Sequence, residues 1–255
     1  MGLAVMSQVL IAYTGPNKKT ASAGKKPENE SAADQQGCLI KGKPDLCQEM
    51  DRDERGWEMS NWSNGGVFNC LWNPQNISFG NGIMTIKLTK DGGSYPYDSG
   101  EYRTSAEKVS YGYYEARMKT AKGAGLVAGT FFTCTVDGSH DEVDVEVLGK
   151  NTTQVQFNYF SAGKGGHEEL IDLGFDASKG FHNYGFVWKN DSIQWFIDGK
   201  LVCTATKDIP SKPGRITVNF WPGTSALLFW LGGVYNGKGG QVQVQYDWIK
   251  YKSLR

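Results

Sequence analysis

The stretch "GSHDEVDVEVLGK", residues 138–150, decides the fold class that the sequence predicts. Side chains of a β-strand point alternately to opposite faces, so the charged and the apolar residues of this stretch separate completely. One face carries three carboxylates and the other three valines: Glu142, Asp144 and Glu146 against Val143, Val145 and Val147. A period of two with one apolar face is typical of a strand that packs on a core through one side.

Similar alternating runs recur along the chain on both sides of this strand. They occupy residues 82–90, 111–120, 152–160, 181–189, 192–206, 214–222 and 240–252. Asp198 and Gly199 separate two such runs and predict a hairpin with a two-residue turn. No segment of the sequence has a sustained period of 3.6 residues. The sequence therefore predicts an all-β fold, an antiparallel sandwich or jelly roll of about 200 residues.

The composition favours a neutral partner. The chain has 255 residues with 27 basic and 27 acidic side chains, so its formal net charge is zero. This balance lacks the charge that attracts nucleic acids and anionic membranes, and we expect neither as a partner. The 33 glycines, 8 tryptophans and 12 tyrosines suit a protein of strands and turns with aromatic surfaces. Sugars are neutral and have flat apolar faces, so they fit this profile, and we expect a monomer.

The first 50 residues are expected to lie outside the folded domain. Residues 1–16 contain an apolar run that is too short to span a bilayer, and it fits either the remnant of a secretory signal or a disordered end. Residues 17–37 are polar and low in complexity, as in a linker. We therefore expect an N-terminal segment at 1–50, disordered or removed by processing, and a jelly-roll domain at 51–255 that carries the functional site.

The cysteines are odd in number. They are Cys38, Cys47, Cys70, Cys134 and Cys203. A bridge between Cys38 and Cys47 would tie down the start of the fold in an exported protein, but sequence alone does not fix the pairing.

The residues alone leave three interpretations of the carboxylate row open. A solvated strand face is the commonest fate of such a pattern, but solvated faces usually mix both signs, and neighbouring like charges destabilise a sheet. A calcium site would use carboxylate oxygens, but such sites usually lie on loops that wrap the ion. The third interpretation is glycoside hydrolysis, which in its usual form needs two carboxyl groups flanking the scissile bond.

Glycoside hydrolysis sets a geometric condition on Glu142 and Glu146. Their Cα atoms would be about 13 Å apart in an ideal strand, whereas a retaining glycosidase holds its carboxyl groups about 5 to 5.5 Å apart. A strand on the concave side of a curved sheet tilts its side chains inward, which makes convergence feasible. Asp144 between them can hydrogen-bond one glutamate, and the repulsion in the row then raises one pKa, as a general acid needs.

The residues around the row carry a resemblance to a known family. The segment "DEVDVEVLGKNTTQVQFNYF" resembles the catalytic segment of the glycoside hydrolases of family 16. The surrounding chain is similar to the bacterial lichenases of that family, which are endo-β-1,3-1,4-glucanases. The similarity continues through "SNGGVFNCLW" at 63–72, "SGEYRT" at 99–104, "WFIDGK" at 195–200 and "WLGGVYNG" at 230–237.

This resemblance implies a fold and a reaction. The fold is a β-jelly roll of two stacked antiparallel sheets whose concave face forms an open cleft for a linear glucan. Glu142 is the implied nucleophile, Glu146 the general acid and then base, and Asp144 the assisting group between them. The implied activity is that of a secreted enzyme that hydrolyses β-1,4 linkages in mixed-linkage β-1,3-1,4-glucan, such as lichenan or barley β-glucan, with retention and without a cofactor.

The resemblance also implies which residues bind the sugar chain. Aromatic rings offer a flat area to the CH face of a pyranose, while amides, carboxylates and guanidinium groups bind hydroxyls. The positions similar to the sugar subsites of the family are Asn64, Phe68, Glu101, Arg103, Phe132, Asn158, Asn219, Trp221 and Trp230. We expect His140 to contact sugar or the Asp144 network.

Three further positions have other expected roles. Trp188 and Trp248 are expected in the core. Asp247 resembles the position of a structural Ca²⁺ ligand on the convex side of the family fold.

The chain departs from the family pattern next to the carboxylate row. His140 replaces a tryptophan, and Cys134 and Phe160 replace tyrosines. Ser99 stands in the place of a cysteine that would bridge to Cys70. The related plant xyloglucan transglycosylases also begin their motif with "HDEVD", so a xyloglucan-type hydrolase or transglycosylase, or another β-glucan hydrolase of this fold, is the alternative function. A non-catalytic carbohydrate-binding jelly roll is a further alternative, but a lectin gains nothing from three carboxylates in one row.

Overall fold

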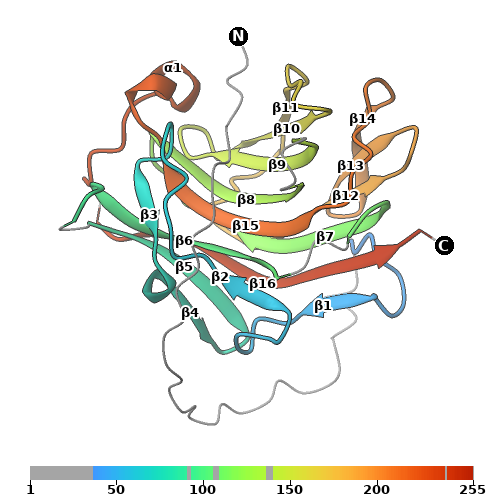
Figure 1. The fold of residues 1–255 in the computed structure, drawn as a ribbon, viewed down its shortest axis with the longest axis horizontal. Helices are drawn as coiled ribbons and strands as arrows, with labels where there is room; N and C mark the ends of the chain where they lie inside the picture. The colour runs from blue at the N-terminus through green and yellow to red at the C-terminus, as the bar shows by residue number, and fades with distance from the viewer. Residues whose placement is uncertain (1–36, 91–92, 106–108, 136–139, 239, 255) are drawn as a thin grey trace.

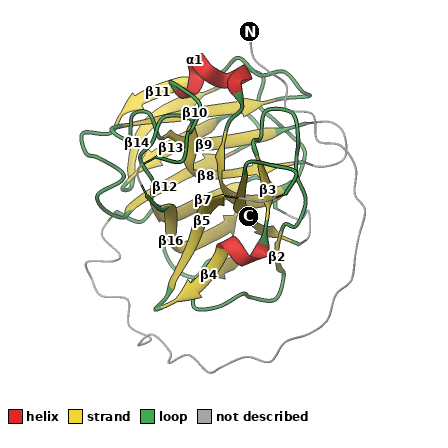
Figure 2. Ribbon diagram, turned by 90° about the vertical axis from the view of Figure 1, so that its left-hand side faces the viewer, coloured by secondary structure: helices red, strands yellow, loops and turns green. Residues whose placement is uncertain are grey.

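The protein is described here by a computed structural model that covers residues 37–90, 93–105, 109–135, 140–238 and 240–254. Strands make up nearly all the regular structure of these ranges (Figure 2). The helical segments are short: η1 (Pro74–Asn76), η2 (Ser225–Leu227) and α1 (Leu228–Leu231). None of the helices in the described ranges is long and apolar enough to cross a membrane. The predicted all-β class is confirmed.

The strands form two layers that are joined along one side. The first layer runs β11 (Glu169–Asp172), β10 (Gln154–Phe160), β9 (Glu142–Leu148), β8 (Leu126–Cys134), β15 (Arg215–Pro222), β6 (Tyr97–Thr104) and β2 (Trp57–Met59). The second runs β5 (Ile83–Lys90), β16 (Val242–Ser253), β7 (Gly112–Lys119), β12 (His182–Trp188), β13 (Ile193–Ile197) and β14 (Lys200–Ala205), with β4 (Ile77–Gly80) on β5 and β1 (Leu46–Gln48) on β16. The last residues of β5 pair with β6 and connect the layers, and β3 (Cys70–Trp72) pairs parallel to β6. All other strand pairs are antiparallel.

The core lies between the two layers. The rings of Phe157 on β10 and Trp195 on β13 stack with centroids 5.4 Å apart. Trp195 Nε1 also donates a hydrogen bond across the layers to the backbone oxygen of Asp144 on β9, at 3.1 Å. Trp188 and Trp248 are buried, as expected. These contacts fix the backbone of β9, and the strongly curved strands beside it are visible in Figure 1.

The long alternating runs of the sequence correspond to strands. The runs at 82–90, 152–160 and 240–252 correspond to β5, β10 and β16. The hairpin prediction is confirmed, because Asp198 and Gly199 connect β13 to β14 with φ angles of 48° and 72°. Positive φ at both central residues is the property of the type I′ turn that suits the twist of a hairpin.

The start of the domain lies earlier than the sequence predicts. Residues 37–50, which the expected boundary at 51 leaves outside, belong to the fold: β1 pairs with β16, and Met50 has no exposed surface. The backbone amides of Leu39 and Ile40 donate hydrogen bonds to the buried carboxylate of Glu115, at 2.7 and 3.2 Å. The remainder of the expected N-terminal segment, residues 1–36, lies outside the described residues.

The bridge between Cys38 and Cys47 is not formed in the structure. Cys38 is buried, and its sulfur accepts a hydrogen bond from Asn183 Nδ2 at 3.7 Å. Cys47 lies at the centre of β1, where strand alternation turns its side chain to the solvent and its thiol donates to Glu49 Oε1 at 2.7 Å. The two thiols therefore point to different environments.

Candidate active site

The three carboxylates of β9 point into a cleft on the outer face of the first layer. Their neighbours Val143, Val145 and Val147 are fully buried between the layers. The alternation in the sequence thus separates the side chains that face the core from those that face the cleft. Asp144, in the middle of the row, is 3% exposed, so its carboxyl group lies almost completely out of contact with solvent.

Strand register places the other cleft residues in rows beside the carboxylates. Asp144 is paired with Asn158 on β10 and with Phe132 on β8. Phe132 is in turn opposite Thr217 on β15, and Thr217 is opposite Arg103 on β6. Because paired residues of neighbouring strands share a face, one continuous row of side chains crosses five strands of the layer.

All the predicted catalytic and sugar-binding residues line this one cleft, which has a volume of about 530 Å³. They are Asn64, Phe68, Glu101, Arg103, Phe132, His140, Glu142, Asp144, Glu146, Asn158, Asn219, Trp221 and Trp230. The sequence interpretation missed other lining residues: Val67, Thr130, Gln156, Gly166, Glu168, Arg215, Thr217 and Leu227. Gln156 could have been found, because it precedes Asn158 by two residues and therefore shares its face.

Burial and mutual repulsion shift the protonation of the row. Burial raises the pKa of Glu146 to about 8, and the negative charge of Glu142 adds to the rise. Burial also raises the pKa of Asp144 well above its ordinary value, and the charges of Glu142 and Glu146 act in the same direction. Asp144 is hydrogen-bonded to Glu142. The row therefore holds protons at neutral pH, which a row of solvated carboxylates would not.

Gln156 connects Glu146 to the aromatic wall of the cleft. Its Nε2 atom donates a hydrogen bond to Glu146 Oε2 at 3.1 Å. Its Oε1 atom accepts one from Trp230 Nε1 at 3.0 Å. The two bonds fix the orientation of the amide, and the bond to Glu146 opposes the rise of that pKa because it favours the charged form.

A second polar group lies on β6. Glu101 is 5% exposed, and its carboxylate accepts hydrogen bonds from Ser60 Oγ at 2.6 Å and from Asn219 Nδ2 at 3.3 Å. Burial raises the pKa of Glu101, and both hydrogen bonds oppose that rise. Arg103 extends over the ring of Trp62, with 4.3 Å between the guanidinium carbon and the ring centroid. This end of the cleft thus combines a fixed carboxylate with a stacked cation.

Aromatic rings form one wall of the cleft. Phe68 and Trp221 have ring centroids 4.3 Å apart, and Trp221 and Trp230 have centroids 6.2 Å apart. Trp221 is 5% exposed and Phe68 is 8% exposed, so both pack against the core as well as lining the cleft. Such rings supply apolar area to a sugar without flexible side chains.

Several buried polar atoms of the cleft have no hydrogen-bond partner among the described residues. The oxygens among them include Thr130 Oγ1, Asn158 Oδ1 and Asn219 Oδ1. Buried oxygens of this kind are normally paired, and leaving one unpaired costs about 1–3 kcal/mol. Hydroxyl groups of a sugar chain in the cleft could satisfy all three.

His140 and Cys134 lie at the Glu142 end of the row. His140 Nε2 is 3.5 Å from Glu142 Oε2, and the His140 ring meets the ring of Phe160 edge-on, at 4.7 Å between centroids. The carboxylate that His140 approaches is thus that of Glu142, and contact of His140 with sugar or with the Asp144 network stays a prediction. Cys134 ends β8 and is paired with Glu142.

Asp141, which precedes the row, has a different function. Strand alternation turns its side chain away from the cleft, and it is 5% exposed. Its carboxylate accepts hydrogen bonds from the backbone amides of Ala162, Ser211 and Lys212, at 2.7 to 2.9 Å. Asp141 therefore anchors two neighbouring loops to the start of β9.

The predicted calcium ligand Asp247 has a cationic partner. Arg117 Nε donates to Asp247 Oδ2 at 3.1 Å. A calcium ion on that oxygen would have to displace the guanidinium group, and calcium needs six to eight oxygen ligands. Calcium binding at Asp247 therefore stays a prediction.

An all-β sandwich with a carboxylate row in an aromatic cleft defines the architecture of a polysaccharide hydrolase. The chain belongs to family 16 of the glycosyl hydrolases, because the model of that family matches residues 64–250. This match includes the whole carboxylate row and all the cleft residues except Trp62.

Similar proteins agree with this assignment. The chain is 49% identical over 203 residues to a beta-glucanase of Acetivibrio thermocellus, covering 78% of this chain and 59% of the relative, so it spans about three fifths of that protein's length. It is 50% identical over 202 residues to a beta-glucanase of Paenibacillus macerans, covering 77% of this chain and 83% of the relative. A solved prokaryotic beta-1,3-1,4-glucanase (lichenase) from a mouse hindgut metagenome superimposes with a TM-score of 0.78 at 44% identity, covering 82% of this chain and 99% of that structure.

Proposed function

We propose that this chain is a retaining endo-β-1,3-1,4-glucanase that hydrolyses β-1,4 linkages in mixed-linkage β-glucan by double displacement. The carboxylate row of β9, in a cleft lined by aromatic rings and amides, carries the proposal. The names of the similar proteins, beta-glucanase and lichenase, support the substrate class. The length of the cleft strands suits an enzyme that cuts within a linear chain.

In this mechanism Glu146 is the general acid. A carboxyl group with a pKa of about 8 still holds its proton at neutral pH and can give it to the glycosidic oxygen as the bond breaks. In the second half of the reaction, the resulting carboxylate takes a proton from the attacking water. The group ends the cycle in the state in which it began.

Glu142 is the nucleophile. Its carboxylate attacks the anomeric carbon and forms a glycosyl ester while the leaving sugar departs with the proton from Glu146. Water then breaks the ester bond and releases Glu142, so two inversions give net retention. Glu142 lies at the start of β9 and its side chain is 18% exposed, which leaves it open to a substrate in the cleft.

Asp144 is the positioning residue between the two glutamates. It is hydrogen-bonded to Glu142, and its raised pKa favours the protonated form that can donate such a bond. A donor on Glu142 stabilises the carboxylate that leaves the glycosyl ester. Asp144 thus assists the second displacement without touching the scissile bond.

Substrate, cofactor and location follow from the same mechanism. Every step uses the side chains of one chain and water, so we propose a monomeric enzyme that needs no cofactor. A glucan polymer is too large to cross a membrane, which supports action outside the cell. We propose that the catalytic domain includes residues 37–50 in addition to the expected 51–255.

The test is a panel of polysaccharides with reducing-end release as the measurement. Barley β-glucan and lichenan are expected to be cleaved well, and laminarin, xyloglucan and carboxymethylcellulose poorly or not at all. Proton NMR of the first products should show the β-anomer, which reports retention. Preference for xyloglucan would show that His140 and Cys134 change the specificity, and binding without any cleavage would contradict an enzyme.

A further inference from the structure

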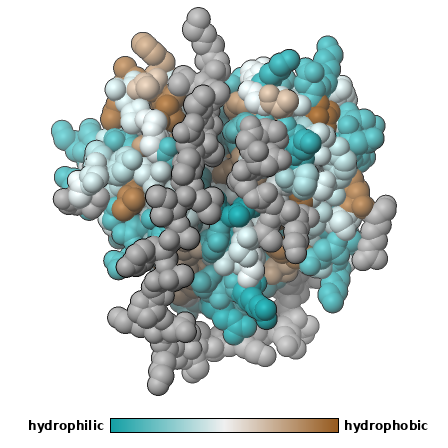
Figure 3. Space-filling view, in the orientation of Figure 1, coloured by the Kyte–Doolittle hydropathy of each residue, from teal (hydrophilic) through white to brown (hydrophobic). Residues whose placement is uncertain are grey.

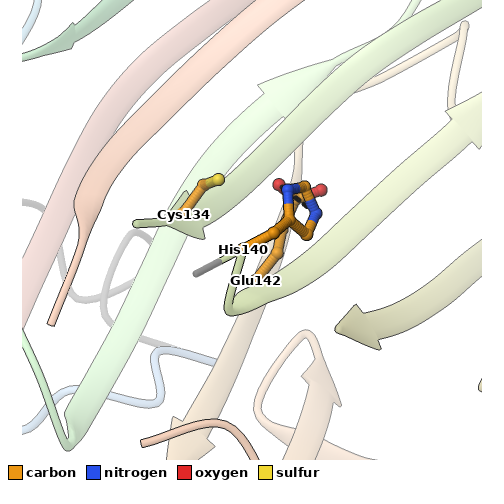
Figure 4. A group of neighbouring side chains, drawn as sticks. All are labelled: Cys134, His140 and Glu142. Atoms are coloured by element: carbon orange, nitrogen blue, oxygen red, sulfur yellow. Dashed lines mark ion pairs between the residues drawn. The ribbon is translucent and has the colours of Figure 1, made fainter. Parts of the chain in front are cut away.

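Three side chains of different chemistry converge at one end of the carboxylate row. Cys134 ends β8, Glu142 begins β9 directly opposite, and His140 precedes Glu142 by two residues. One possible ligand atom of each lies within 4.8 Å of the other two. Figure 4 shows the imidazole of His140 against the carboxylate of Glu142, with Cys134 on the neighbouring strand.

The chemistry of this group matches one kind of ligand. A thiolate, an imidazole nitrogen and a carboxylate oxygen are the three donors that proteins use for zinc, whereas calcium and magnesium prefer oxygen alone. Zinc bonds of 2.0 to 2.3 Å at tetrahedral angles place ligand atoms about 3.3 to 3.8 Å apart. The 3.5 Å between His140 Nε2 and Glu142 Oε2 already lies in this range.

The surroundings also favour a cation. His140 Nε2 is buried and has no hydrogen-bond partner among the described residues. The thiol of Cys134 donates to its neighbour's backbone oxygen, at 3.2 Å, and is hydrogen-bonded to the carboxylate of Glu142. A metal can replace both of these weak thiol bonds.

We propose that Cys134, His140 and Glu142 form a binding site for a single Zn²⁺ ion at the end of the cleft. The thiol loses its proton to solvent as the sulfur–zinc bond forms, the imidazole binds through Nε2, and the carboxylate supplies one oxygen. Small rotations of Cys134 bring its sulfur into bonding range. Three protein ligands leave the fourth tetrahedral position to water.

Occupation of this site has a consequence that rests on the proposed function. Glu142 cannot coordinate zinc and attack the anomeric carbon at the same time, so bound zinc stops the first displacement. Zinc is thus a reversible inhibitor that competes with the glucan, and a chelator restores the activity. Sensitivity to zinc would depend on Cys134 and His140, which stand where the resemblance leads one to expect tyrosine and tryptophan.

The experiment titrates the full chain with ZnCl2 in a calorimeter, with Co²⁺ as a spectroscopic probe. The wild type is expected to bind one Zn²⁺, and Cys134→Ser and His140→Asn should each weaken the affinity by about tenfold or more. Bound Co²⁺ should give a thiolate-to-cobalt charge-transfer band that Cys134→Ser abolishes. Cys203→Ser, which removes a half-buried thiol on β14, is the matched control and should keep both signals.

The outcomes separate the metal site from the function. Equal zinc affinity of the wild type and of both variants, with circular dichroism spectra that show all three folded, would overturn the site. Loss of binding in both variants supports it. If zinc binds through these residues while hydrolysis of barley β-glucan continues unchanged, the site stands and the nucleophile assigned to Glu142 is wrong.

Discussion

The side-chain amide of Gln156 donates a hydrogen bond to the carboxylate of Glu146 over 3.1 Å. The same amide accepts a hydrogen bond from Trp230 at 3.0 Å, so its orientation is fixed from the opposite side. A ring on the cleft wall and the proposed general acid are therefore linked through one residue. A sugar that moves the Trp230 ring would also alter the proton affinity of Glu146.

Removing the amide should raise the pKa of Glu146 further. The bond from Gln156 stabilises the charged carboxylate and lowers this pKa, so Gln156→Met loses that effect while keeping the length of the side chain. The proposed general acid must be protonated to act, so activity should fall as pH rises through the pKa of Glu146. We expect this basic limb of the kcat/KM profile to move to higher pH by roughly half a unit to one unit.

Gln154→Met is the matched control for this variant. Gln154 lies on the same strand, but its amide donates to Asp172 at 2.8 Å, near the edge of the layer. Its pH profile should follow the wild type. A basic limb that stays in place in Gln156→Met would show that the hydrogen bond does not tune Glu146.

Small anions should distinguish the two glutamates by stereochemistry. In Glu142→Ala the nucleophile is missing, so azide attacks from its side and gives a glycosyl azide of inverted configuration. In Glu146→Ala the ester still forms from an activated aryl glycoside, and azide, which needs no general base, releases a product of retained configuration. NMR of the azide products provides the measurement, and the opposite pair of configurations would reverse the assignment.

The buried proton of Glu146 should make stability depend on pH. Its pKa is raised from 4.5 to about 8, so the folded state binds more protons than the unfolded state between these values. The free energy of unfolding therefore falls as pH rises through this window. Glu146→Gln removes the effect. From acidic to alkaline pH, the free energy of unfolding of this variant should therefore rise relative to that of the wild type by more than about 1.4 kcal/mol, the equivalent of one pKa unit.

Urea unfolding at about pH 5 and about pH 9 measures this difference. Glu169→Gln removes an exposed carboxylate on β11 that does not line the cleft, so it controls for net charge. If the free energy of unfolding differed between Glu146→Gln and the wild type by the same amount at both pH values, Glu146 would not be protonated in the folded state.

Two truncations should separate the linker from the fold. Deletion of residues 1–36 removes the short apolar run at 1–16 and most of the polar stretch that follows it, and we expect activity and thermal stability to stay within error of the full chain. Deletion of residues 1–50 also removes β1, the buried Met50 and two amide donors to Glu115. That loss should cost at least about 3 kcal/mol of stability, measured by thermal unfolding. Equal stability of both truncations would contradict the earlier domain start.

The parts of the fold that the sequence predicts are those whose periodicity reports burial directly. The valines and carboxylates of β9 alternate because one face packs on the core, and the sequence shows this without help from other strands. β8 gives a weaker signal, because seven of its nine residues are buried and the apolar run has no alternation. β1 has only three residues, and its pairing with β16 joins distant parts of the chain.

The candidate site likewise has features that the sequence predicts and features that it does not. A strand's own period predicts that Glu142, Asp144 and Glu146 share one face. The position of Cys134 opposite Glu142 depends on the register between β8 and β9, which sequence patterns do not reveal. Asp141 shows the limit of counting carboxylates, because it adjoins the row and yet binds backbone amides on the other side.

The division of β9 into a packing face and a chemical face sets how this enzyme can evolve. Substitutions of the valines are constrained only by packing in the core, and substitutions of the carboxylates only by the chemistry in the cleft, because the two sets do not share a surface. Loss or gain of a single residue within the strand would instead exchange the two sets, placing three acids in the core and three valines in the cleft. The strand should therefore accept many substitutions over evolutionary time, while insertions and deletions accumulate in the turns that flank it.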